Sequence, residues 1–317
     1  MDLARKTAFV TGGGHGIGAA LCGAFAQRSM AVVVADIDGE AARTVAESIN
    51  AQGGRAIGLE CDVGRRESVE NAAWESLRIY QSVHVVCNNA GVAVTGAIGS
   101  LSPEDWNWIF DVNVKGVIHG VETFVPLIRS HGEGGFILNT ASVGGFLSGP
   151  LAEPYAATKH AIVALTEGWR AQLQPDGIGV ALLCPHFVKT TIANSEDRRS
   201  DRYGRRKETD DERAALARRG IETGLDPSIV AERAIEGLMA GETYIFTHPT
   251  AREPLTAYFA NILSALDAAD RSQILSKIDV WPPMFRPNLK ARPAAGFAAR
   301  TIWVNSSAND CGSAPLR

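Results

Sequence analysis

The sequence predicts an α/β protein with a parallel sheet covered by helices on both faces. Short runs of apolar and β-branched residues alternate with longer stretches of helical periodicity; seven runs span residues 7–10, 31–35, 56–60, 83–87, 135–139, 179–184 and 243–247. The runs are almost continuously apolar, which is typical of strands buried on both faces. The first helical stretch places Ile17, Leu21, Ala24 and Phe25 on one stripe, as expected for a helix that packs on such a sheet.

Two later helices are marked by their first residues. Ser102 precedes Pro103 and two acidic residues. This order is typical of a helix start, because serine caps the first amides, proline fits the first turn and acids favour the positive end of the helix dipole. Asp226 followed by Pro227 marks another start in the same way.

The composition argues against several classes of protein. The 317 residues carry a net charge of −4, so no basic surface for nucleic acid is expected. No apolar run approaches the roughly 20 residues of a membrane span, and the amino terminus leads directly into a strand rather than a signal or transit peptide. The five cysteines are widely spaced and form no CxxC pair. We therefore expect no disulfide framework, no metal site, and a cytoplasmic location.

The turn after the first strand is rich in glycine. It reads Thr11-Gly12-Gly13-Gly14-His15-Gly16-Ile17-Gly18 and opens the first helix. Glycines in this context let backbone amides approach a pyrophosphate at the positive end of the helix, which predicts a doubly wound Rossmann fold that binds a dinucleotide.

Asp36 ends the second strand, about 20 residues downstream of the glycine turn. Its carboxylate can accept hydrogen bonds from ribose hydroxyls and would repel a 2′-phosphate. We therefore expect NAD rather than NADP. His15 stands where NADP users often carry a basic residue, which agrees with this choice.

Tyr155 and Lys159 are four residues apart on a helical stretch and share one face. Tyrosine, with a pKa of about 10, is a poor base at neutral pH, and a nearby ammonium would favour its ionised form. Ser142 follows the strand at 135–139. Because ligands bind at the carboxyl ends of strands in such sheets, its hydroxyl is placed to hold a substrate oxygen beside the tyrosine.

Taken together, these motifs resemble the short-chain dehydrogenase/reductase family over roughly residues 5–250. The glycine turn resembles the family's TGxxxGxG loop, and residues 88–91 read NNAG. The resemblance implies a catalytic set of Asn113, Ser142, Tyr155 and Lys159. It also implies cofactor contacts from Gly12, Gly14, His15, Gly16, Ile17, Gly18, Asp36, Asp62, Val63, Asn89, Ala90, Gly91, Tyr155, Lys159, Pro185, Val188 and Thr190.

The implied reaction is reversible hydride transfer between a secondary alcohol and NAD. By this resemblance Tyr155 acts as general base and Ser142 orients the oxygen. Lys159 lowers the pKa of the tyrosine and binds the nicotinamide ribose, while Asn113 holds a proton-relay water.

The sequence departs from the family after the sixth strand, where the usual Pro-Gly is replaced by Pro185-His186 and then Phe187. Two interpretations stay open: His186 narrows the substrate pocket, or it points to solvent. The expected substrate-pocket residues are largely apolar and include no fixed cation, which favours a hydrophobic alcohol or ketone, aromatic ones included; they are Val94, Val143, Gly144, His186 and Phe187.

Within the family, the long segment 191–225, Gly144-Gly145-Phe146, Phe124-Val125-Pro126 and Thr247-His248-Pro249 are similar to bacterial dehydrogenases that oxidise benzylic Cα alcohols of lignin-type aryl ethers. Steroid, terpene or alicyclic alcohol dehydrogenases and carbonyl reductases remain alternatives. An alternative of another class is a non-catalytic NAD-binding regulatory module.

We expect one Rossmann-type catalytic domain over residues 1–250, in which the charged segment 191–225 forms a mobile substrate lid with a solvated face. A C-terminal helical extension follows over 251–280, and residues 281–317 form a poorly ordered tail. The resemblance implies a homodimer or homotetramer. The apolar residues that could line either that interface or the internal core are Val117, Val121, Phe124, Ile162 and Leu165.

Overall fold

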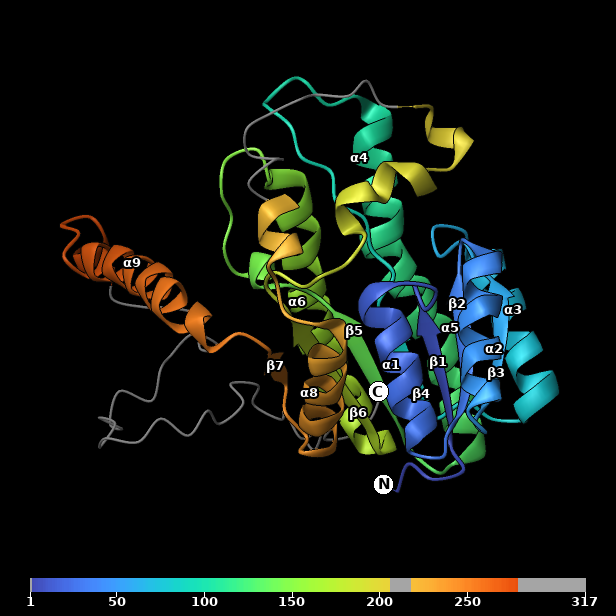
Figure 1. The fold of residues 1–317 in the computed structure, drawn as a ribbon. Coiled ribbons are helices and arrows are strands. Elements are labelled where there is room, and N and C mark those ends of the chain that lie inside the picture. Colours follow the sequence, from blue (N-terminus) through green and yellow to red (C-terminus); the bar gives the residue numbers. More distant parts are fainter. Residues whose placement is uncertain (1, 206–217, 279–317) are drawn as a thin grey trace, which may run out of the picture. The chain divides into compact units, whose positions relative to one another are not determined.

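The structure is a computed structural model that describes residues 2–205 and 218–278. Seven strands form one sheet in the order β3-β2-β1-β4-β5-β6-β7, and all neighbouring pairs are parallel (Figure 1). The predicted sheet is confirmed. Its strands are β1 (Thr7–Thr11), β2 (Ala31–Asp36), β3 (Arg55–Glu60), β4 (Val85–Asn88), β5 (Gly135–Thr140), β6 (Ile178–Cys184) and β7 (Tyr244–Phe246).

Helices cover both faces of the sheet. One layer contains α1 (Gly16–Gln27), α2 (Gly39–Ala51) and α8 (Pro227–Met239), and the other contains α3 (Arg66–Tyr80), α5 (Gly116–His131) and α6 (Glu153–Leu173). Neighbouring residues of β1 serve opposite layers because side chains alternate along a strand. Phe9 packs on Phe124 of α5 with ring centroids 4.5 Å apart, whereas Val10 lies in the cluster with Leu21 of α1.

The chain leaves β1 in one direction toward β3 and then returns to place β4 on the other side of β1. This reversal opens a crevice at the carboxyl ends of β1 and β4, where ligands bind in open α/β sheets.

The helix starts predicted from sequence are present. Ser102 caps α4 (Pro103–Phe110) in a reciprocal capping box with Asp105, and the Asp226 side chain caps α8. α4 runs through a π-turn, η1 (Asp111–Lys115), directly into α5. A π-turn inside a helix is frequent at functional sites, and this one contains Asn113.

A buried chain of side-chain amides ties α6 to the sheet. The Asn88 Nδ2 donates to Asn139 Oδ1 at 2.8 Å, and the Asn139 Nδ2 donates to Thr166 Oγ1 at 2.9 Å. Since Thr166 belongs to α6, this chain sets the position of that helix against the ends of β4 and β5.

The chain divides into two compact units, Met1–Phe259 and Ala260–Arg317. The predicted helical extension is represented by α9 (Arg252–Asp270) and a short turn, η7 (Leu275–Lys277). Large apolar side chains of α9 are exposed, namely Tyr258, Phe259, Ile262, Leu263 and Leu266. The expected tail at 281–317 lies outside the described residues.

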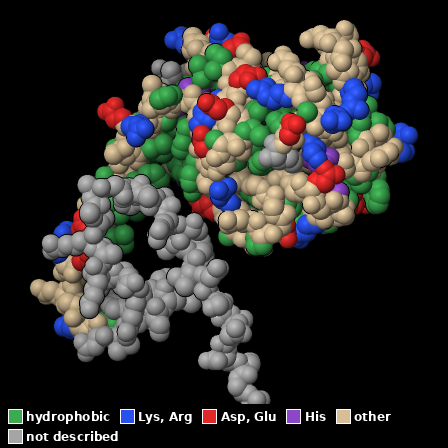
Figure 2. Space-filling model, turned by 90° about the horizontal axis from the view of Figure 1, so that it is seen from below, with side chains coloured by type: hydrophobic (Ala, Val, Ile, Leu, Met, Phe, Trp, Pro, Cys, Tyr) green, Lys and Arg blue, Asp and Glu red, His purple; other side chains and the backbone are tan. Residues whose placement is uncertain are grey.

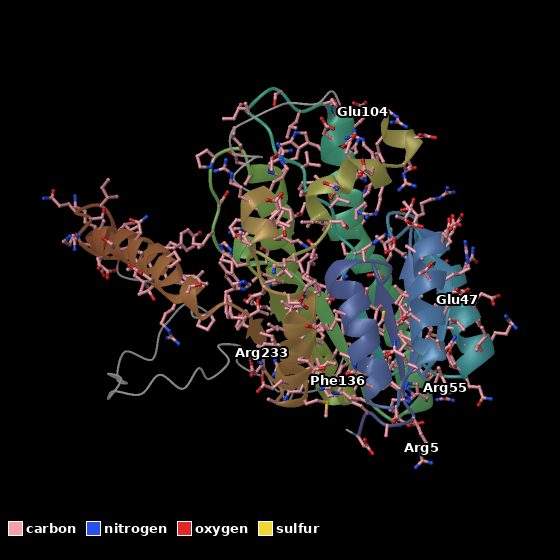
Figure 3. All side chains as sticks on the ribbon, viewed as in Figure 1. Arg5, Glu47, Arg55, Glu104, Phe136 and Arg233 are labelled. Carbon is pink, nitrogen blue, oxygen red and sulfur yellow. The ribbon has the colours of Figure 1, made fainter. Side chains whose placement is uncertain are left out.

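The surface of the described residues carries both signs of charge. Lys, Arg, Asp and Glu side chains are interspersed over the face seen in Figure 2, and Glu47, Arg55 and Glu104 project outward in Figure 3. Among the described helices, none is long and apolar enough to cross a membrane.

Candidate active site

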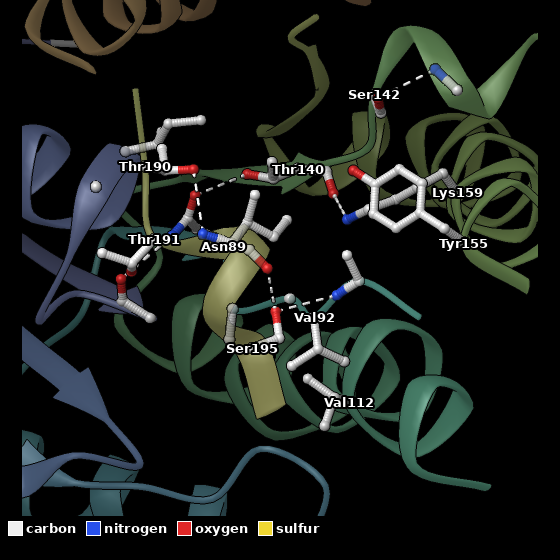
Figure 4. A pocket seen from close by; sticks show the side chains of 18 of the residues that line it. Asn89, Val92, Val112, Thr140, Ser142, Tyr155, Lys159, Thr190, Thr191 and Ser195 are labelled. Carbon is white, nitrogen blue, oxygen red and sulfur yellow. Dashed lines mark hydrogen bonds between the residues drawn. The ribbon is translucent and has the colours of Figure 1, made fainter. Parts of the chain in front are cut away.

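A cavity of about 630 Å³ lies at the carboxyl ends of the strands and brings most of the predicted site residues together (Figure 4). Predicted residues from the glycine loop, the strand ends and α6 line this one cavity. Those that do not line it are Gly14, Gly18, Val94 and Asn113.

Side chains would not fit at two glycines of this loop, because other backbone atoms pack closely around them. Gly12 has a φ of 63°, and a Cβ added there would lie 2.9 Å from the Ala90 Cα. A Cβ on Gly18 would lie 1.9 Å from the Gly12 carbonyl oxygen. The first turn of α1 contains no acidic residue, so the positive end of the helix is left to an anion. These features fit the pyrophosphate of a dinucleotide.

Asn89 and Thr11 hold the glycine loop against the end of β4. The Thr11 hydroxyl accepts hydrogen bonds from the backbone amides of Asn89 and Ala90 at 3.0 and 3.1 Å, and the Asn89 Nδ2 donates to the Thr11 carbonyl at 3.1 Å. Both predicted elements, the loop and the NNAG segment, are therefore one rigid wall of the cavity.

Asp36 lies at the end of β2 and lines the cavity while only 5% exposed. Its two oxygens accept the backbone amides of Gly14 at 2.9 Å and Asp38 at 3.0 Å. A carboxylate has about four acceptor sites, so two remain for ribose hydroxyls. The Gly14 amide thus positions Asp36, and the His15 imidazole lies 3.6 Å from the Asp38 carboxylate.

The charged segment 191–225 does not simply present a solvated face, and this corrects the expectation from sequence. In its described part, Arg199 forms a buried ion pair with Asp105 at 2.6 Å. Arg202 pairs with Asp62 at 2.7 Å, and the Tyr203 hydroxyl donates to Asp111 at 2.8 Å. The partners Asp105 and Asp111 are far away in sequence, which is why charge density alone did not reveal them.

The segment also closes over the loop that follows β4. The Ser195 Oγ accepts the Ala93 amide at 3.2 Å and donates to the Ile192 carbonyl at 2.6 Å. Ser195, Arg202 and Tyr203 all line the cavity, and none of them was predicted as a site residue. The described part of segment 191–225 therefore contacts the cavity wall both at Asp62 and at the loop after β4.

Ser142, Tyr155 and Lys159 meet at the inner end of the cavity (Figure 4). The Lys159 ammonium is only 3% exposed and donates to the Thr140 carbonyl at 2.8 Å. It lies 5.6 Å from the centre of the Tyr155 ring. The Ser142 hydroxyl donates to the Pro185 carbonyl at 3.3 Å and accepts the Gly144 amide at 3.0 Å.

Burial is the main influence on the pKa values of this group. Burial raises the pKa of Tyr155, while its hydrogen bond with Ser142 lowers it, and burial is the larger effect. Burial also lowers the pKa of Lys159 from its ordinary 10.5 to about 8, with Cys184 opposing. The ammonium donates to the Thr140 carbonyl, and no direct hydrogen bond joins it to the phenol oxygen among the described contacts.

Asn113 is fully buried beneath the site rather than in the cavity wall. Its Oδ1 accepts the Val92 amide at 2.8 Å, and its Nδ2 donates to the Val92 carbonyl at 2.9 Å and to the Thr158 hydroxyl at 3.1 Å. The side chain thus joins the strand-end loop to α6 between Tyr155 and Lys159. Both hydrogens of its amide are therefore used within the chain.

The outer end of the cavity is apolar and aromatic. Val143, Gly144, His186 and Phe187 line it as predicted, together with Trp108 and Leu147. Val94 does not: it is 1% exposed and packs against Trp108 and Tyr203, because residues 92–95 turn its side chain toward α4.

Two arginines of segment 191–225 also line the cavity. One of them, Arg202, is neutralised by Asp62. The other, Arg198, donates to the Thr191 hydroxyl at 3.1 Å.

A second polar cluster lies at the amino ends of the strands and consists of His84, His131 and Glu133. Most of its polar atoms have partners within the chain. The His84 Nδ1 accepts the Thr7 amide at 3.2 Å, so its proton is on Nε2, which faces Glu133 at 3.4 Å. Lys6 also pairs with Glu133. This pattern describes a hydrogen-bonded cluster rather than an open metal site.

Comparisons with known proteins show the family to which the chain belongs. A family model described as short chain dehydrogenase matches residues 6–201. The C alpha-dehydrogenase of Sphingobium sp. (strain NBRC 103272 / SYK-6) is 34% identical over 267 residues, or 84% of this chain and 88% of the relative. The cyclohexanol dehydrogenase of Acinetobacter sp. (strain SE19) is 34% identical over 191 residues, or 59% of this chain and 75% of the relative.

Among solved structures, a short chain dehydrogenase/reductase from Burkholderia phymatum in complex with NAD matches with a TM-score of 0.81 and 34% identity, over 84% of this chain and 96% of the other. Fold and cavity define the class as a dinucleotide-binding α/β protein. The chain belongs to the short-chain dehydrogenase family and is an oxidoreductase of that family.

Substituting Gly18 by alanine tests whether the close packing of the glycine loop is needed for cofactor binding. Because the new Cβ would lie 1.9 Å from the Gly12 carbonyl oxygen, the loop must shift, and we expect a loss of about 1–3 kcal/mol in unfolding free energy and at least about tenfold weaker NAD binding. Urea unfolding and titration calorimetry measure both. Gly23→Ala is the matched control on α1, with no neighbouring atom within 4 Å; equal effects of the two variants would contradict the prediction.

Substituting Lys159 by methionine tests the buried ammonium. The unfolded chain keeps this proton up to pH 10.5, whereas the folded chain releases it above about pH 8. In that window the unfolded state binds more protons, so folding stability rises with pH. Unfolding free energies of wild type relative to Lys159→Met should therefore increase by roughly 3 kcal/mol from pH 8 to 10.5. A difference that stays flat across this range would refute the prediction.

Proposed function

We propose that this protein is an NAD-dependent dehydrogenase that interconverts a hydrophobic secondary alcohol, with benzylic alcohols foremost, and its ketone. The observation that carries the proposal is the meeting of Ser142, Tyr155 and Lys159 between the dinucleotide cradle and an apolar, aromatic end of the same cavity. A hydroxyl-bearing carbon placed there lies between a proton acceptor and the site for the cofactor.

The residues divide the work by position. Tyr155 takes the hydroxyl proton as general base, and Ser142 holds the substrate oxygen. When bound, NAD accepts the hydride. Lys159 holds the cofactor ribose, and its ammonium then helps to stabilise the tyrosinate, which offsets the effect of burial on the pKa of Tyr155. Asn113 keeps the loop at Val92 and α6 in register, and the π-turn around it is the proposed place for a relay water.

NAD is preferred over NADP on the strength of Asp36. Its carboxylate lines the cavity at the end of β2, and Asp38 lies directly behind it with His15. A 2′-phosphate at this place would meet two carboxylates, whereas ribose hydroxyls would donate to Asp36. The similar Burkholderia structure holds NAD, which supports the same choice.

The substrate end favours a flat, apolar group. Trp108, Phe187 and the Tyr155 ring line it together with aliphatic side chains, and aromatic pairs add to the free energy of burial. The C alpha-dehydrogenase relative points in the same direction. The cyclohexanol dehydrogenase relative keeps alicyclic alcohols as the second candidate.

We propose a homodimer or homotetramer as the working assembly. Val117, Val121, Phe124 and Ile162 lie in the core of a single chain, so their burial is already explained without a partner. Light scattering at micromolar concentration would measure the state directly.

Replacing Tyr155 by phenylalanine should lower kcat by about 10²- to 10⁴-fold, because the general base is removed. NAD affinity should stay within about twofold, since the ring is retained. Absorbance at 340 nm with a panel of benzylic, steroid, terpene and alicyclic alcohols measures turnover. Tyr80→Phe makes the same chemical change outside the cavity and serves as control. Wild-type kcat in Tyr155→Phe would overturn the assignment, and NAD binding without any turnover by wild type would favour a regulatory module.

Replacing Asp36 by asparagine should weaken NAD and admit NADP. Loss of a charge-assisted hydrogen bond and of the repulsion is expected to shift the ratio of kcat/KM values toward NADP by about 10- to 100-fold. Steady-state rates with each cofactor at fixed alcohol measure the ratio. A ratio that stays at the wild-type value would mean that Asp36 does not select the cofactor.

A further inference from the structure

His248 lies in the connection between β7 and α9 and contacts the backbone of the loop that follows β6. Its Nδ1 accepts the His186 amide at 3.2 Å, and its Nε2 lies 3.0 Å from the Phe187 carbonyl oxygen. The Thr247 hydroxyl lies 2.7 Å from the same Nδ1. Backbone groups of two successive residues, the His186 N–H and the Phe187 C=O, are therefore held by one imidazole from a distant part of the chain.

These contacts determine the tautomer. Since Nδ1 accepts an N–H, the proton of the neutral ring is on Nε2, where it is donated to the Phe187 carbonyl. Burial lowers the pKa of His248, and this favours the neutral ring that both contacts require.

The loop at 185–188, to which His248 is bonded, contacts Ser142 directly. The Pro185 carbonyl accepts hydrogen bonds from the Val143 amide at 2.9 Å and from the Ser142 hydroxyl at 3.3 Å. Its next two residues, His186 and Phe187, line the substrate end of the cavity. A displacement of the loop would thus move two cavity-lining residues, His186 and Phe187, and also the Pro185 carbonyl to which the Ser142 hydroxyl donates.

The loop is held from its other side as well. The Leu225 amide donates to the Phe187 carbonyl at 3.0 Å, and the Lys189 amide donates to the Leu225 carbonyl at 2.9 Å. The Phe187 ring occupies the space where a side chain on Gly220 would lie, 2.8 Å from the added Cβ. Among the described residues, the side chain of His248 adds bonds from beyond β7 to the backbone at 186–187.

We propose that His248 is a positioning residue that fixes the loop at 185–188 and thereby sets how tightly the alcohol is held against Ser142 and Tyr155. The inference rests on the proposed function. The contacts of His248 also explain how the chain accommodates His186 in place of glycine. The centroid of the His186 ring lies 4.4 Å from that of Phe187 and 5.7 Å from that of His248. His248 also bonds to the backbone of both His186 and Phe187.

The test compares His248→Ala, His248→Asn and His248→Gln with wild type, all loaded with NAD. Asparagine keeps an acceptor for the His186 amide, and glutamine keeps a donor for the Phe187 carbonyl. Hydrogen exchange of the peptide over 185–190 reports the loop, and steady-state kinetics with an aryl carbinol report its effect. Thr250→Ala, an exposed change in the same connection, is the control.

We expect His248→Ala to speed exchange in this peptide and to raise KM for the alcohol roughly tenfold, with kcat and NAD affinity within about twofold of wild type. The asparagine and glutamine variants should each recover part of the loss. Unchanged exchange, faster exchange with unchanged KM, or equal losses in all three variants would each overturn the proposal. If wild type oxidises no alcohol of the panel, the proposed function fails, while the exchange result still decides whether His248 holds the loop.

Discussion

The buried ammonium of Lys159 is the constraint around which the site is organised. Removing a charge from water is costly unless it is hydrogen-bonded, and Lys159 meets this need with the Thr140 carbonyl at the end of β5. That bond draws α6 against the sheet and places Tyr155 one turn away, facing the cavity. Burial of the ammonium in this position lowers the pKa of Lys159. Burial of this charge lowers the free energy of unfolding, and the proposed role of Lys159 in holding a cofactor ribose gives a reason for that cost.

The rest of the site consists of polar side chains that fasten strand ends to helices. Asn89 is hydrogen-bonded to the glycine loop. Asn88, Asn139 and Thr166 form a chain of hydrogen bonds that joins the strand ends to α6. Asn113 is hydrogen-bonded to the loop at Val92. Each bond is buried or partly buried, where an unmatched amide would be costly. The strand ends of the cavity are therefore rigid, which suits a reaction that depends on placing a carbon and a cofactor ring at a fixed separation.

The outer wall is made by segments from the later half of the chain. Arg202 pairs with Asp62, and the Tyr203 hydroxyl donates to Asp111 at the start of the π-turn. His248 and Leu225 hold the loop after β6. Described residues of segment 191–225 and of the loop after β6 thus line the same cavity.

Local patterns in the sequence were enough to predict the seven-stranded sheet, the glycine loop and the facing pair Tyr155 and Lys159. Apolar runs, turn glycines and an i, i+4 spacing act between residues close in the chain. The tertiary structure alone decided the direction of Val94, the docking of Arg199 and Arg202, the pKa of Tyr155 and the brace from His248. Each of these depends on a partner or a degree of burial that is set by residues distant in sequence, and such contacts exist only once the sheet and its loops have folded together.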